Sequence, residues 1–215
     1  MKLLSILALA ILLPGLASAD HHKGGEGFVE LFNGKNLDGW KINESPNSWK
    51  VENGEIIIKG PRSHLFYAGK VNNAAFTNFE VKLKVLTKAK ANAGFYFHTK
   101  FQDSGWPKKG FEAQINATHG DPKKTGSLYG VRNVMNTAPH KDDEWFDYHI
   151  TVQGKMITIK VNGKTTIAYT EPKGGPTAKE KGGFDRVLSS GTFAIQCHDP
   201  GSEVHIKSIK VKPLK

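Results

Sequence analysis

The chain has 215 residues, a formal charge of +10 and a single cysteine, Cys197. One cysteine excludes an intramolecular disulfide, so the stability of the fold must come from its core. Many of the lysines alternate with apolar residues, as on the solvated side of strands, which argues against a nucleic-acid-binding surface.

The first nineteen residues have the features of a signal peptide. Lys2 precedes an apolar run that ends in the small-residue pattern Ala17-Ser18-Ala19. The run is shorter than the roughly twenty residues of a membrane-spanning helix. We therefore predict export to the periplasm or the medium, with no transmembrane segment. The expected organisation is a signal peptide at 1–19, a flexible leader at 20–27 and a single β-sandwich domain at 28–215.

Beyond the leader, the periodic segments predict strands. Asn53-Gly54 and Asn162-Gly163 predict tight hairpin turns, because both residue types tolerate positive φ. Short strands with frequent turns, and no helical spacing, predict an all-β, antiparallel jelly-roll sandwich. Loops are expected at 117–143 and 171–183. The strands are expected at 28–32, 37–42, 49–51, 55–59, 65–67, 79–86, 93–99, 110–116, 145–152, 156–161, 164–169, 191–198 and 203–211.

Three of these strands carry polar side chains opposite their core residues. Successive side chains of a strand point to opposite faces, so a row of polar groups would line one face of a sheet. Trp106, Tyr129 and Arg132, on neighbouring loops, could wall this row. Amides bind sugar hydroxyls and aromatic rings pack against sugar C–H groups, so we predict a sugar-sized cleft. The row consists of Tyr96, His98, Glu112, Gln114, Asn116, Gln196 and His198.

His98, Glu112 and His198 are the candidates for chemistry. Two imidazoles and a carboxylate could also hold one divalent metal ion in an open site. The nucleophile motif Gly-x-Ser-x-Gly, a phosphate-binding loop and a dinucleotide fingerprint are all missing from the sequence. Cys197 lies in an apolar strand and is expected to be a buried, unreactive thiol.

A series of longer motifs resembles one family over nearly the whole mature chain. The motifs are, in order, FVELFNGKNLDGWK, WKVENGEIIIKG, NFEVKLKVLTKAKANAGFYFH, GFEAQINATHGDPKKTGSLYGV, EWFDYHITVQGKMITIKVNGK and GTFAIQCHDPGSEVHIKSIKVK. They resemble the 3-keto-disaccharide hydrolase family. The resemblance implies a concanavalin A-like lectin/glucanase fold and a glycoside or oligosaccharide substrate whose C3 hydroxyl has been oxidised to a ketone.

That substrate implies a distinct chemistry. A ketone at C3 acidifies the hydrogen on C2, so a base can remove it and the anomeric group can leave. His98 or Glu112 would accept the proton, and His198 would assist. A divalent metal could stabilise the enolate. The sugar would be bound by Tyr96, Trp106, Gln114, Tyr129, Arg132 and Gln196. An oxidoreductase partner could supply the ketone.

A retaining glucanase mechanism is disfavoured. The glucanases of this fold carry several acids on one strand, whereas this chain has Glu112, Gln114 and Asn116.

Two interpretations other than an enzyme stay open. A non-catalytic carbohydrate-binding module could use the same face. A structural domain of the cell envelope is the third possibility.

Overall fold

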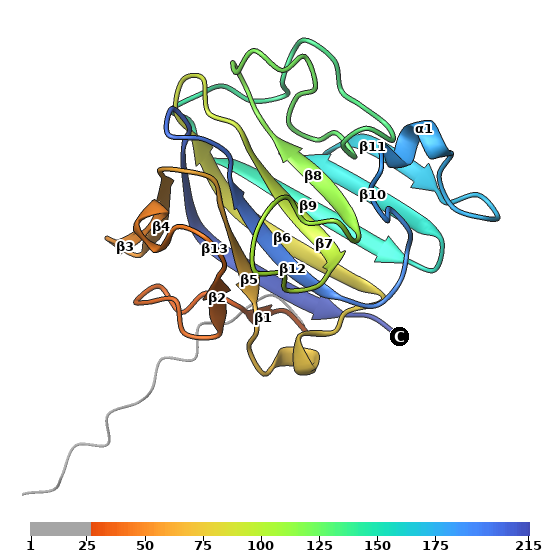
Figure 1. Cartoon of the computed structure of the whole chain (residues 1–215), viewed down its shortest axis with the longest axis horizontal. Coiled ribbons are helices and arrows are strands. Elements are labelled where there is room, and N and C mark those ends of the chain that lie inside the picture. The colour runs from red at the N-terminus through yellow and green to blue at the C-terminus, as the bar shows by residue number, and fades with distance from the viewer. Residues whose placement is uncertain (1–26) are drawn as a thin grey trace, which may run out of the picture.

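A computed structural model describes residues 27–215, which form two antiparallel sheets packed face to face (Figure 1). The predicted signal peptide at 1–19 and all but the last residue of the predicted leader lie outside this range, so both stay predictions. Within the described range, none of the helices is long and apolar enough to cross a membrane.

The sheets confirm the prediction of an all-β, antiparallel fold. The larger sheet has the order β11 (Lys164–Thr170), β10 (Met156–Val161), β9 (Phe146–Gln153), β6 (Phe79–Thr87), β13 (Glu203–Pro213), β4 (Glu55–Lys59) and β3 (Trp49–Glu52), and β1 (Val29–Glu30) also pairs with β13. The smaller sheet has the order β2 (Trp40–Ile42), β5 (Ser63–Tyr67), β12 (Thr192–Cys197), β7 (Ala93–Thr99) and β8 (Phe111–Ile115).

Both predicted hairpin turns are present. Asn53 and Asn162 have φ values of 51° and 49°, and each is followed by a glycine that also has positive φ. The first turn joins β3 to β4 and the second joins β10 to β11. Asparagine and glycine permit this backbone at little steric cost, so the local sequence alone specifies these turns.

Three short helices were not predicted. They are the 3₁₀ helices η1 (Pro46–Ser48) and η2 (Val71–Ala74), and the α-helix α1 (Ala178–Lys181). The side chain of Thr177 accepts a hydrogen bond from the Glu180 backbone, and the Glu180 carboxylate accepts one from the Thr177 backbone. This capping box is a recognised start signal, but a four-residue helix is too short to show an apolar period.

Aromatic rings hold the sheets together. Phe79, on β6 of the larger sheet, lies 5.0 Å from Phe193 and 5.9 Å from Phe97 of the smaller sheet, measured between ring centroids. Burial of each such ring is worth about 1.5–3 kcal/mol. Cys197 is buried and free, and burial raises the pKa of its thiol to about 11, in agreement with the predicted structural role.

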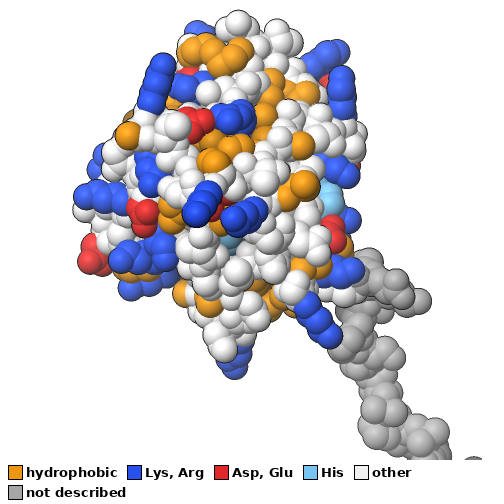
Figure 2. All heavy atoms as spheres, turned by 90° about the vertical axis from the view of Figure 1, so that its right-hand side faces the viewer, with side chains coloured by type: hydrophobic (Ala, Val, Ile, Leu, Met, Phe, Trp, Pro, Cys, Tyr) orange, Lys and Arg blue, Asp and Glu red, His pale blue; other side chains and the backbone are white. Residues whose placement is uncertain are grey.

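Basic side chains are spread over the surface rather than gathered on one patch in the view of Figure 2, where acidic side chains lie among them. Several pair with carboxylates across strands, such as Lys84 with Asp147 at 3.0 Å and Lys59 with Glu203 at 2.8 Å. This distribution is typical of solvated strand faces, as the alternating pattern of the lysines predicts.

A bulge in β7 interrupts the alternation of that strand. Thr192 pairs with Thr99 but Ala194 pairs with Tyr96, so β7 contains one more residue than β12 across this interval. His98 absorbs the extra residue with a φ of 56°. A β-carbon on Gly191 would lie 2.5 Å from the carbonyl carbon of His98, so glycine leaves the space that the bulge requires.

Candidate functional site

A cavity of about 230 Å³ lies on the face of the smaller sheet that points away from the sandwich core. Strands β7, β8 and β12 provide its floor, because Tyr96, Glu112, Gln114 and Gln196 sit between core-facing neighbours on these strands. The volume lies below the about 300–1,000 Å³ of pockets for drug-sized ligands. It therefore suits a small ligand such as a single sugar ring.

The structure brings most of the predicted site residues together, although their roles stay predictions. The lining includes Tyr96, Trp106, Glu112, Gln114, Tyr129, Gln196 and His198. Asn116, the last member of the polar row, instead holds the following loop: its side-chain N–H groups donate to the carbonyl oxygens of Asp121 and Lys123.

The prediction that His98 faces the cleft is wrong. Because of the bulge, its ring packs against Phe79 and Phe97, with centroid distances of 5.7 and 5.6 Å. Its Nδ1 accepts a hydrogen bond from the Ser189 backbone at 3.2 Å, which leaves Nε2 to donate to the Thr77 carbonyl at 2.9 Å. Burial lowers the pKa of His98 to about 4, so the ring is neutral.

The predicted metal ligands consequently do not meet. Residues 27–215 contain no group of three His, Cys, Asp or Glu side chains placed to hold a metal ion. Glu112 and His198 both line the pocket, but His98 is fixed in the core behind β7. This set does not fit a metal ion.

The prediction that Arg132 walls the cleft is also wrong. It is exposed, pairs with the Glu180 carboxylate and stands over the Tyr169 ring. Arg186 lines the pocket instead, with only 8 % of its surface exposed.

Five further lining residues were missed: Asn92, Pro107, Gly110, Phe184 and Arg186. All five lie outside the strands of the structure, and only Gly110 falls in an expected strand, as the first residue of 110–116. Two backbone hydrogen bonds join the loop at 107–110 to the loop at 184–186. The Asp185 N–H donates to the Lys108 carbonyl at 2.7 Å, and the Gly110 N–H donates to the Asp185 carbonyl at 2.9 Å. A phenylalanine and an arginine just after Gly182-Gly183 were the only local signal, and it is a weak one.

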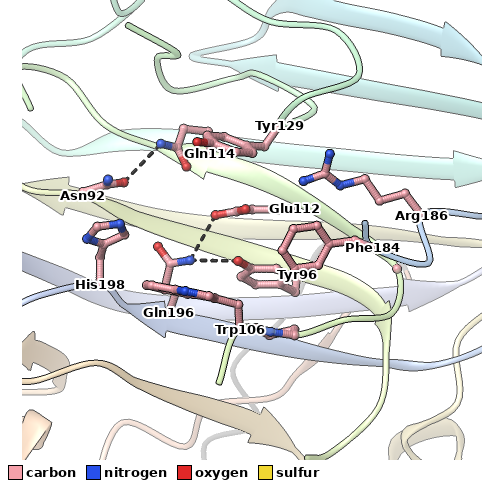
Figure 3. Close-up of a pocket in the computed structure, with 12 residues that line it drawn as sticks. Asn92, Tyr96, Trp106, Glu112, Gln114, Tyr129, Phe184, Arg186, Gln196 and His198 are labelled. Atoms are coloured by element: carbon pink, nitrogen blue, oxygen red, sulfur yellow. Dashed lines mark hydrogen bonds between the residues drawn. The ribbon is translucent and has the colours of Figure 1, made fainter. Parts of the chain in front are cut away.

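Glu112 lies at the centre of the pocket (Figure 3). Its Oε1 accepts a hydrogen bond of 3.2 Å from Nε2 of Gln196. A β-carbon at Gly94 would lie 2.3 Å from this oxygen, so only glycine leaves room for the carboxylate in this position. Burial raises the pKa of Glu112 to about 7, which allows it to gain and lose a proton near neutral pH.

Arg186 approaches the pocket from the opposite side to His198 (Figure 3). Its Nη1 donates to the backbone carbonyl of Glu180 at 2.6 Å. The guanidinium carbon lies 5.0 Å from the Phe184 ring centroid and 5.9 Å from that of Tyr129. The capping box of α1 therefore helps to hold a cation beside the pocket, where it can stabilise negative charge on a ligand.

His198 is oriented by Asp199. The His198 Nδ1 lies 2.8 Å from Oδ2 of Asp199, which also accepts a hydrogen bond from the Ser202 hydroxyl, while Oδ1 of the same carboxylate accepts one from the Gly201 backbone. An acceptor at Nδ1 leaves Nε2 as the nitrogen available to a ligand. The Trp106 ring lies 5.1 Å from the imidazole and forms the adjacent wall.

Tyr129 forms the wall above Glu112 (Figure 3). Its hydroxyl donates to Asp121 at 2.8 Å and its backbone N–H donates to the Glu112 carbonyl at 2.9 Å. Burial raises the pKa of the phenol above its ordinary value, so the hydroxyl stays protonated. Aromatic walls around a floor of amides and a carboxylate are the arrangement expected for binding a sugar.

The two packed antiparallel sheets form a jelly roll of the concanavalin A-like type, as in several proteins of known structure. A candidate glycosyl hydrolase from Parabacteroides distasonis superposes with a TM-score of 0.73 and 24% sequence identity, covering 88% of this chain and 95% of its own. A carbohydrate-binding module from Bacillus subtilis gives a TM-score of 0.53 at 11% identity, with coverages of 81% and 95%. The mannose- and calcium-bound lumenal domain of VIP36 gives 0.56 at 10%, with coverages of 82% and 83%.

These likenesses establish the fold, and the family is established by the sequence. Residues 27–212 match the model of the 3-keto-alpha-glucoside-1,2-lyase-like domain, and the chain belongs to this family. The resemblance drawn from the motifs is thereby confirmed. Membership makes the chain a glycosyl-hydrolase-like, carbohydrate-active protein. No curated protein matches the chain.

Proposed function

We propose that this chain is an enzyme that cleaves 3-keto-glycosides by removing the proton on C2. The observation that carries the proposal is the state of Glu112, a buried carboxylate with a pKa of about 7 in the middle of the pocket. A base poised near neutral pH is what proton abstraction beside a ketone requires. Family membership supports the same class of substrate.

The reaction begins at the carbon between the ketone and the anomeric centre. Glu112 takes the C2 proton, and the electrons of that C–H bond form the enolate across C2 and C3. The enolate then re-forms the C3 carbonyl, a double bond forms between C1 and C2, and the bond from C1 to the glycosidic oxygen breaks. Water adds to C1 and a proton returns to C2, which gives the free 3-keto sugar.

The arrangement around Glu112 matches the order of atoms in such a ring. C1 and C3 flank C2, just as His198 and Arg186 lie on opposite sides of Glu112 (Figure 3). With C2 at the carboxylate, the Arg186 guanidinium stabilises the enolate oxygen on C3. His198, held at Nδ1 by Asp199, uses Nε2 to protonate the leaving oxygen and later to take a proton from water.

The remaining side chains bind the sugar. Trp106 and Tyr129 offer aromatic surface for the C–H groups of the ring, and Tyr96 lies beside Glu112 as a hydrogen-bonding group. Burial keeps the Tyr96 hydroxyl protonated, since it raises the pKa of the phenol well above its ordinary value.

The test is to incubate the purified protein with a 3-keto-disaccharide and to follow release of the reducing sugar, with and without a chelator. The matching disaccharide with an unoxidised C3 hydroxyl is the control, and it should not be cleaved. Glu112→Ala should abolish release. Saturable binding without product, under all conditions, would refute the enzyme and favour a carbohydrate-binding module.

Export is part of the same proposal. An exported enzyme would act on glycosides outside the cytoplasm and would need an oxidoreductase to introduce the ketone. Cell fractionation, with N-terminal sequencing of the mature protein, tests the export step. A mature N-terminus at Asp20 would agree with the predicted cleavage after Ala19.

A further inference from the structure

Two side-chain oxygens on the pocket floor have no hydrogen-bond partner. Gln114 and Gln196 line the pocket and are 1 % and 3 % exposed. Within residues 27–215, neither Oε1 accepts a hydrogen bond. A buried carbonyl oxygen without a donor is costly, and such groups are rare in folded proteins unless a ligand or water completes them.

The orientation of the Gln196 amide is set by Glu112. Its Nε2 donates to the Tyr96 hydroxyl at 2.8 Å and to Glu112 Oε1 at 3.2 Å. When Glu112 is ionised, as it must be to accept a proton, a reversed amide would place its oxygen against a carboxylate that can only accept. The amide oxygen of Gln196 therefore points away from Glu112, into the pocket (Figure 3).

The orientation of the Gln114 amide is set by a chain of three contacts. The backbone N–H of Asp121, which can only donate, lies 3.1 Å from His119 Nδ1, so that nitrogen is an acceptor. Asn92 consequently turns its Nδ2 toward His119, at 3.4 Å. Its Oδ1 then accepts from Gln114 Nε2 at 3.1 Å, which leaves the Gln114 oxygen for the pocket.

Both amides thus donate their N–H groups to protein atoms and present only their oxygens, as hydrogen-bond acceptors, to a ligand. We propose that Gln114 and Gln196 select the substrate by accepting hydrogen bonds from two hydroxyl groups of the 3-keto ring. Gln196 lies beside the base, so its partner is the hydroxyl on C2, and Gln114 takes a second hydroxyl of the same ring. This assignment rests on the proposed function and adds the pattern of donors that the substrate must present.

Binding of 1,5-anhydro-3-ketoglucitol, which has no exocyclic leaving group at C1, tests the direction of these hydrogen bonds in the wild type, where the Glu112 carboxylate is kept. Calorimetry would compare this ketone with its deoxy and deoxyfluoro analogues at C2, C4 and C6. We expect at least tenfold weaker binding for the deoxy analogues at C2 and at one other position. The fluoro analogues should lose as much, because fluorine cannot donate. Fluoro analogues that bind as tightly as the parent would overturn the proposal.

The same panel with Gln114→Met and Gln196→Met, each made singly in the wild type, identifies the partners. Each change should weaken binding of the parent at least tenfold but cause no further loss for the analogue that lacks its hydroxyl. Gln153→Met, on the exposed end of β9, is the matched control and should change nothing. Equal losses on every analogue, or no binding by any of the panel, would overturn the assignment. Turnover by the wild type is measured separately, so failure of the proposed function remains distinguishable.

Discussion

Gly94 and Glu112 are so close across β7 and β8 that a β-carbon at position 94 would lie 2.3 Å from Glu112 Oε1. The glycine stands in a strand, where this residue type is otherwise unfavourable. Its small size is therefore explained by the side chain that it accommodates. A strand residue without functional groups of its own sets the position of the proposed base.

Gly94→Ala should displace the carboxylate while leaving the fold intact. We expect kcat/KM for a 3-keto-glucoside to fall about 100-fold, the effect of moving a reacting group by about 1 Å. Gly120→Ala is the matched control, because a β-carbon there meets nothing within 4 Å. If Gly94→Ala retained wild-type kcat/KM, the position of Glu112 would not matter for the reaction.

Glu112→Gln should remove activity and increase stability above neutral pH. The folded pKa of about 7 exceeds the ordinary value of 4.5, so the folded state binds the extra proton between these values. Stability is therefore lost as pH rises through this interval, at about 1.4 kcal/mol per pH unit. Glutamine cannot ionise and escapes this loss. Chemical denaturation at pH 8 should show a more stable variant, whereas exposed Glu52→Gln should show none of this gain.

The pH dependence of wild-type activity follows from the same group. A base must be unprotonated, so kcat/KM should rise as the pH increases through an apparent pKa near 7. A profile that is flat between pH 5 and pH 8 would show that Glu112 is not the base.

Arg186→Met should lower kcat by about 100- to 1,000-fold, the typical effect of removing one stabilising group from a developing oxyanion. Arg132→Met is the control, since that residue pairs with Glu180 but stays outside the pocket. Equal effects of the two substitutions would show that Arg186 acts only through the stability of the α1 region.

His64→Phe should stabilise the protein in mild acid. His64 is fully buried, neither ring nitrogen has a hydrogen-bond partner within residues 27–215, and burial lowers its pKa to about 3. Between the ordinary pKa of 6.5 and the folded value of about 3, the unfolded state binds more protons than the folded state. The free energy of unfolding therefore falls as the pH falls, by about 1.4 kcal/mol per pH unit.

Denaturation curves between pH 4 and pH 7 would measure this dependence. Both His64→Phe and His64→Gln should flatten it, and only phenylalanine should also add stability at pH 7, because it removes the unpartnered polar atoms. A slope unchanged by either substitution would assign the acid sensitivity to other groups, such as His98, whose burial acts in the same direction.

The local sequence determined the strands, the two asparagine–glycine turns and the faces of β8. These features depend on contacts between near neighbours: side chains alternate along a strand, and a tight turn needs residues that accept positive φ. Glu112 and Gln114 could be placed opposite Phe111 and Ala113 for this reason. The family could be recognised because its motifs lie along the chain in order.

Tertiary structure decided which of the polar residues meet. The alternation of β7 predicts that His98 faces the cleft, but the extra residue in this strand turns its side chain into the core. That bulge depends on the pairing of β7 with β12 and on the space left by Gly191. Arg186 comes from a loop without periodicity, held by contacts to another loop and to α1. Periodicity describes one strand at a time, whereas the pocket is formed where strands and loops distant in sequence converge.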